Sequence, residues 1–219
     1  MPRDITPEDI VILVDGRGAV VDLDGPGLRS THDYEIISDS GDPLQTGMFP
    51  FMSAELLGHP YYPPDDATEP PVHHFIHDLE SFLLVLVWMC LTREGPAKRR
   101  RDLSSTQQTE QLSALRRTVF RLFEGDKEVL SLAKRHLMHI ATRRRLVDVE
   151  LLCYVSDFMA PLKDLIFEFL SLISIAYEDN RRDTQAVYED ALRLFDKHIR
   201  SLQKEDPSGL SKKPRENKE

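Results

Sequence analysis

The stretch HDLESFLLVLVWMC, residues 77–90, decides the fold. After its first turn it is apolar on nearly every face, and a helix with that pattern is buried on all sides. Asp78 falls at its N-terminal end, where a carboxylate interacts favourably with the positive end of the helix dipole. The stretch therefore predicts a buried central helix, on which a helical platform is built.

The chain downstream of this stretch is predicted to be helical, because apolar residues recur at helical spacing. Residues 95–110 form a predicted polar connection. Pro161 divides a predicted helix over 147–160 from one over 162–177, and it suits the first turn of the second helix. Asp183 or Thr184 can cap a last helix that runs to about Leu202. The two recurring series are Leu112, Leu115, Val119 and Leu122, and then Val129, Leu130, Ala133 and Leu137.

The chain upstream has a different character. Residues 10–23 hold two β-branched runs on either side of Asp15-Gly16-Arg17-Gly18, which predicts a β-hairpin. Residues 24–72 are irregular and contain eight of the fourteen prolines. A loop of this length is unusual in a compact domain and is often functional.

Composition excludes several classes of protein. The net charge of −9 disfavours nucleic acid, whose phosphates require Lys and Arg. Two cysteines, Cys90 and Cys153, are too few for a disulfide framework, so we expect reduced thiols in a protein of the cytoplasm or nucleus. The charged N-terminus is no signal peptide, and the apolar stretch 82–91 is too short to span a bilayer. We expect an intracellular protein with neither nucleic-acid nor membrane partners.

Three aspartates near the start suggest phosphoryl transfer. Asp4 and Asp9 are separated by four residues, and Asp22 follows the predicted hairpin. Phosphoryl transfer needs one carboxylate to orient the attacking hydroxyl and further ligands to hold Mg²⁺ against the phosphates. Mg²⁺ prefers oxygen ligands, which carboxylates supply.

The order of these elements resembles the C-terminal lobe of a eukaryotic protein kinase. It runs from a catalytic loop through a hairpin and an acidic turn to a long segment, a motif ending in Glu, and a buried helix headed by Asp. The details resemble the fungal-type protein kinase family. They are the HDLESF helix start, PFMSAELL as a form of A-P-E, DLD at residues 22–24 as a form of D-F-G, and VLSLAKRHL near an A-x-x-K element. The resemblance covers about residues 1–200.

The resemblance implies a fold and a domain layout. We expect a mainly α protein equivalent to a kinase C-terminal lobe, with one small β-hairpin and no N-terminal lobe. Residues 1–203 would form the lobe, followed by a disordered tail over 204–219. Within the lobe, 1–24 would hold the catalytic loop, hairpin and D-F-G equivalent, 25–58 the activation-segment equivalent, and 76–203 the helical bundle.

The resemblance also implies roles for single residues. Arg3 belongs to the catalytic loop and Asp4 corresponds to the catalytic carboxylate. Asp9 and Asp22 correspond to the Mg²⁺ ligands, and Asp78 to a structural residue that binds the catalytic-loop backbone. The implied cofactors are Mg²⁺ and ATP, and the implied substrate is a Ser or Thr hydroxyl on a protein. Glu55 corresponds to the A-P-E glutamate, and its possible arginine partners are Arg143, Arg144, Arg145, Arg181 and Arg182.

The sequence also departs from the family pattern. Pro2 replaces the histidine of H-R-D, Asp9 replaces an asparagine, and Met48 replaces a threonine. We find no glycine-rich loop and no strand lysine to orient ATP, and we therefore expect negligible kinase activity for this chain alone. A non-catalytic pseudokinase or interaction module is the alternative, with a protein substrate or protein partner in either case.

Three other readings are weaker. DLDGPG, residues 22–27, is similar to the opening motif of haloacid-dehalogenase phosphatases, but that fold needs a parallel sheet. His73, His74 and His77 form a superficial metal cluster without a fourth ligand. The basic runs 98–101 and 143–145 are predicted to be solvated helix ends.

Overall fold

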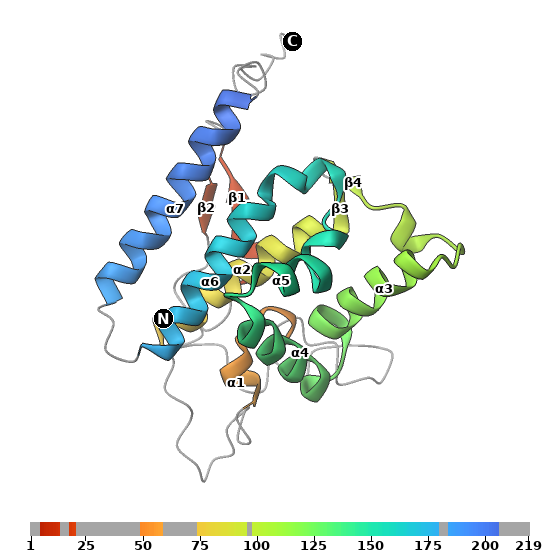
Figure 1. Ribbon diagram of the computed structural model, residues 1–219, viewed down its shortest axis with the longest axis horizontal. Helices are drawn as coiled ribbons and strands as arrows, with labels where there is room; N and C mark the ends of the chain where they lie inside the picture. The colour runs from red at the N-terminus through yellow and green to blue at the C-terminus, as the bar shows by residue number, and fades with distance from the viewer. Residues whose placement is uncertain are drawn as a thin grey trace.

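The computed structural model describes residues 5–13, 18–20, 49–58, 74–95, 98–179 and 184–205. Helix α2, Phe75–Thr92, runs through the middle of this structure (Figure 1). The His74 side chain caps it by accepting a hydrogen bond from the Ile76 backbone N–H. By length and composition α2 could cross a membrane, but 67% of it is buried inside the protein. The predicted buried central helix is confirmed.

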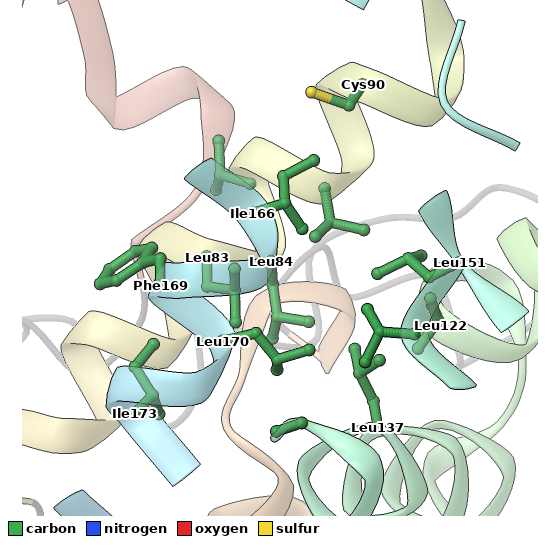
Figure 2. Packing of buried hydrophobic residues seen from close by; sticks show 14 of the residues in the cluster. Leu83, Leu84, Cys90, Leu122, Leu137, Leu151, Ile166, Phe169, Leu170 and Ile173 are labelled. Atoms are coloured by element: carbon green, nitrogen blue, oxygen red, sulfur yellow. The ribbon is translucent and has the colours of Figure 1, made fainter. Parts of the chain in front are cut away.

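The main core lies where α2 meets α6, Lys163–Glu178 (Figure 2). Apolar side chains from both helices interdigitate there, and α4, Lys127–Ile140, closes the core with Leu137. Helix α7, Thr184–Glu205, lies at the outer edge and packs against α6. The central residues come from α2 as Leu83, Leu84 and Cys90, and from α6 as Ile166, Phe169, Leu170 and Ile173.

The other helices follow the predicted apolar spacing, except in the region predicted as a helix over residues 147–160. Helix α3, Glu110–Val119, continues into a π-helical turn, η5, at Phe120–Glu124. The predicted helix over 147–160 is wrong. A helix is present only over α5, Arg144–Glu150. Two 3-10 turns follow it, η6 at Leu152–Tyr154 and η7 at Asp157–Leu162.

Tertiary contacts explain this break. The buried side chains of Leu151, Leu152 and Val155 all turn into the core. The Ser156 backbone N–H donates to the carbonyl of Cys90 at the end of α2, at 3.1 Å. This segment therefore follows the surface of α2, and a continuous helix would carry it away.

Two small antiparallel hairpins are present where one was expected. Strands β1, Ile10–Ile12, and β2, Gly18–Val20, confirm the predicted hairpin. Strands β3, Arg93–Gly95, and β4, Lys98–Arg99, form a second hairpin in the predicted polar connection. Their polar residues carry no apolar alternation, so no pattern revealed them. Neither sheet of the described residues is parallel, as the dehalogenase alternative would require.

The basic run at this second hairpin is not simply solvated. The Arg100 side chain is only 15% exposed and donates to the carbonyls of Leu91, at 3.3 Å, and Tyr154, at 2.6 Å. It ties the end of α2 to the 3-10 turn η6. The prediction of a solvated helix end is therefore wrong for Arg100.

A second, smaller core lies below the first. The 3-10 turn η3, Phe49–Phe51, leads into α1, Ala54–Gly58, which packs directly on α4 (Figure 1). Met52, Leu56, Leu57 and Leu130 form this core. The segment 49–58 is thereby placed between α2 and α4. The described structure is mainly α, as expected, while its equivalence to a kinase C-terminal lobe stays a prediction.

Candidate functional site

The structure describes three of the six predicted site residues. Asp9 lies before β1, Glu55 lies on α1, and Asp78 lies in the first turn of α2. Arg3, Asp4 and Asp22 are outside the described residues, so the gathering of three aspartates stays a prediction.

Asp9 is held in place by its own turn. It ends the 3-10 turn η1, Pro7–Asp9, and its Oδ2 accepts hydrogen bonds from the backbone N–H of Thr6, at 2.8 Å, and from the Thr6 hydroxyl, at 2.9 Å. Two donors fix the orientation of the carboxylate. A cation bound to Asp9 would use Oδ1 or share Oδ2 with these donors.

Asp78 lies at the junction of α2 with α7. It is half-buried, and burial together with the negative charge of Asp78 raises the pKa of Tyr188 on α7. Residues 1–4 of the catalytic-loop equivalent lie outside the described residues, and the predicted contact of Asp78 with the backbone of that loop remains a prediction.

Glu55 binds a histidine. Its Oε2 lies 3.0 Å from Nε2 of His77, whose side chain is 4% exposed. The other ring nitrogen, Nδ1, accepts a hydrogen bond from the His74 backbone N–H at 3.1 Å. A neutral ring with Nδ1 as acceptor carries its proton on Nε2, so His77 donates to Glu55 without becoming charged. His77 thus joins α1 to the start of α2.

Among the described residues, none of the arginines predicted as partners of Glu55 is seen to bind it. Arg144 pairs with Asp148, at 2.8 Å, and with Asp164, at 2.6 Å. Arg181 and Arg182 lie outside the described residues. Of the metal-cluster alternative, His73 lies outside the described residues, while His74 caps α2 and His77 donates to Glu55.

Glu80 is a fully buried carboxylate that joins three helices. Its Oε1 accepts from the Ala54 backbone N–H at 2.8 Å, and its Oε2 accepts from the Tyr177 hydroxyl of α6 at 2.6 Å. Burial raises the pKa of Glu80, while the bonds from Tyr177 and Ala54 and the charge of Lys134 oppose that rise. Burial and the charge of Glu80 raise the pKa of Tyr177, so its phenol stays protonated and donates.

Lys134 is the most unusual side chain of the region. It is fully buried, and its Nζ donates to the carbonyls of Phe49, Pro50 and Met52 at 3.0, 2.9 and 2.8 Å. A buried ammonium is costly unless its donors are satisfied. Three carbonyls on one short turn satisfy them, and they fix the path of the backbone from η3 to α1.

A surface hollow of about 590 Å³ opens beside this anchored segment. It is bounded by α1, α4 and α6, and its charged lining residues are Glu55, Arg135 and Glu178. Ala54 and Tyr177 also line it. The anchored segment therefore presents charged groups around a partly apolar depression.

Residues 1–90 match the family model described as fungal protein kinase. This part of the chain is similar to a fungal protein kinase. The family recognised from HDLESF and PFMSAELL is thus confirmed over these residues, which include the segment 49–58 and most of α2. No curated protein and no solved structure matches the chain. Lys134 and Tyr177 lie beyond the matched residues.

The sequence did not predict the polar contacts of Lys134, Glu80 and Tyr177, although two of these residues carried a signal. Lys134 follows Ala133 and falls four positions after Leu130, so it lies within the apolar stripe of α4. Glu80 falls in the most apolar helix of the chain. A charged residue at a core position predicts a buried polar partner. Tyr177 carried no comparable signal.

Proposed function

We propose that this kinase-like chain binds polypeptide on a rigid platform made by segment 49–58, and that it transfers phosphate weakly or not at all by itself. The observation that carries the proposal is the threefold anchoring of that segment by Lys134, Glu80 and His77. In the resemblance, this segment ends the activation-segment equivalent, residues 25–58, of a family that acts on Ser or Thr hydroxyls of proteins.

The anchors matter because binding costs less when a surface is already ordered. Lys134 fixes the carbonyls of η3, and Glu80 fixes the first N–H of α1. Glu55 remains 67% exposed on the same helix and is therefore accessible to a partner. A fixed backbone with an exposed carboxylate favours a polypeptide that carries a basic side chain.

The chemistry of phosphoryl transfer would fall to the aspartates. Asp4 would orient the hydroxyl, while Asp9 and Asp22 would hold Mg²⁺, which neutralises charge on the phosphates of ATP. Carboxylate oxygens fit that ion, and Asp9 offers one that Thr6 already orients. Pro2 and Met48 cannot supply the hydrogen bonds that His and Thr would give at their positions, so we propose that catalysis is impaired.

Binding is tested with labelled peptides. We expect fluorescence anisotropy to detect peptides in which basic residues flank a serine or threonine. Glu55→Arg should weaken the binding of these peptides at least tenfold, which corresponds to about 1.4 kcal/mol in binding free energy. Glu110→Arg, at an exposed position on α3 that does not line the hollow, is the matched charge control. Absence of binding by every basic peptide would contradict the platform.

Catalysis is tested separately with Mg²⁺ and ATP. We expect labelled phosphate incorporation into a serine-rich protein to equal that of Asp22→Ala, and we expect little thermal shift with Mg²⁺-ATP, because a ligand stabilises only what it binds. Incorporation well above the Asp22→Ala blank would show that the chain is an active kinase.

A further inference from the structure

Helix α7 has more apolar surface than the described residues cover. One stripe, formed by Val187, Ala191, Leu194 and His198, packs onto the core. A second stripe adjoins it and stays open, with exposed fractions of 37% for Tyr188, 69% for Leu192 and 48% for Ile199. Phe195 and Leu202 lie between the two stripes and are half-buried.

The spacing of the open stripe is that of a helix-packing seam. Tyr188, Leu192, Phe195, Ile199 and Leu202 alternate by four and three residues, as the a and d positions of a heptad do. At 100° per residue the two stripes together span roughly 160° of the helix, wider than the roughly 100° that one packed face needs. The excess faces solvent along most of α7.

We propose that this open stripe docks against the same stripe of a second copy of the chain, with the two α7 helices antiparallel. With Phe195 opposite its counterpart, Leu192 lies opposite Ile199 of the partner subunit, and Tyr188 lies opposite Leu202 of the partner subunit. The same register places Glu189 near Arg200 of the partner subunit and Asp196 near Arg193 of the partner subunit. A parallel pairing in register would place each of these charged residues beside the same residue, and so the same charge, of the other copy.

The charged side chains of α7 can change from partners within the helix to partners on a second copy. Arg193 now pairs with Glu189, at 2.9 Å, and Arg200 with Asp196, at 3.7 Å, within one helix. All four side chains are well exposed, and pairs of this kind contribute little by themselves. They can therefore exchange partners across an interface at small cost. The proposal does not depend on the proposed function.

The exposed stripe is narrow, so the dimer is weak and forms at high concentration. A helix of 22 residues is about 33 Å long, and one helix face buries less than a standard interface. We expect sedimentation equilibrium between about 5 and about 500 µM to show a monomer–dimer equilibrium, with Leu192→Glu raising the dissociation constant at least tenfold.

The matched control is Leu132→Glu on α4. Leu132 is 64% exposed, nearly as much as Leu192, and should leave the dissociation constant unchanged. Circular dichroism confirms that both variants fold. A wild-type chain that stays monomeric throughout the range, or an equal effect of the two substitutions, would overturn the proposal.

Cross-linking and charge exchange test the register. In a Cys153→Ser background, Asp196→Cys lies close to the two-fold axis and should cross-link with a short bismaleimide, whereas Lys204→Cys should not. Cys90 stays inert because it is buried and burial raises the pKa of its thiol to about 12. Glu189→Arg and Arg200→Glu should each weaken the dimer, and the double variant should restore it. Equal cross-linking at both sites, or no restoration, would overturn the antiparallel register.

Discussion

The segment 49–58 and helix α7 are both held by a lysine, and the two lysines have nearly the same bond lengths. Nζ of Lys134 lies 2.8–3.0 Å from three carbonyls of the segment. Nζ of Lys197 lies 2.7 Å from both carboxylate oxygens of Glu168, which ties α7 to α6. Lys134 is fully buried, whereas the Lys197 side chain is 62% exposed.

Burial therefore decides the energetic value of these bonds. Water competes with Glu168 for Lys197 and replaces the bond when it breaks, so an exposed pair is worth little. No water replaces a lost bond at Lys134, so the carbonyls that it binds would remain unsatisfied. The comparison indicates one rigid region, which suits binding, and one helix attached mainly by apolar contacts.

The largest expected effect comes from Lys134→Met. Methionine keeps most of the chain length but removes the three donors, leaving the buried carbonyl of Met52, two partly buried carbonyls and the Glu80 charge without the ammonium. We expect a loss of roughly 3–5 kcal/mol in the free energy of unfolding. Urea denaturation followed by circular dichroism measures it.

Lys197→Met is the matched control for that experiment. It removes an ion pair of equal length from the surface and should cost no more than about 1 kcal/mol. Similar losses for the two variants would break the comparison between the regions.

A smaller effect is expected for Tyr177→Phe. This change removes the hydroxyl that donates to Glu80 at 2.6 Å and leaves a buried carboxylate oxygen unsatisfied. We expect a loss of about 1–3 kcal/mol, measured by urea denaturation. Tyr188→Phe on α7, where the ring is 37% exposed, should change stability by less than about 0.5 kcal/mol. If Tyr177→Phe left the free energy of unfolding unchanged, the hydrogen bond from the Tyr177 phenol to Glu80 would not contribute to stability.

The smallest effect is a change in pH dependence. Burial raises the pKa of Glu80 above its usual value of 4.5, so the folded state keeps a proton that the unfolded state has already released. The unfolded state then binds fewer protons, and this group makes the free energy of unfolding fall as pH rises above 4.5 towards the raised value. Glu80→Gln should remove that part of the slope. Denaturation in urea at a series of pH values measures it, and parallel curves for the two proteins would contradict it.

Local pattern was sufficient to predict the elements with strong periodicity. The central helix, the hairpin at residues 10–23 and the last helix follow from runs of apolar residues and turn residues. The pattern failed where distant contacts override local preference. Residues 151–156 leave the helical path because Ser156 binds the end of α2, and no local signal carries that information.

In the candidate site, too, local sequence identified some residues, whereas contacts between distant residues were not predicted. Glu55 and Asp78 were identified from a family motif, because a motif records residue type and spacing. His77 was not predicted as the partner of Glu55, since the two residues are far apart along the chain and meet only when α1 packs beside α2.

The sequence by itself determined the similarity to fungal protein kinases over residues 1–90, the mainly helical class and the central position of α2, because apolar periodicity and motif spacing are properties of the local chain. Only the tertiary structure decided that Lys134, Glu80 and Tyr177 meet at segment 49–58, and that Tyr188, Leu192 and Ile199 of α7 stay exposed. The physical reason is that a buried polar group is stabilised by partners from distant elements, and the packing of the helices determines which partners it meets.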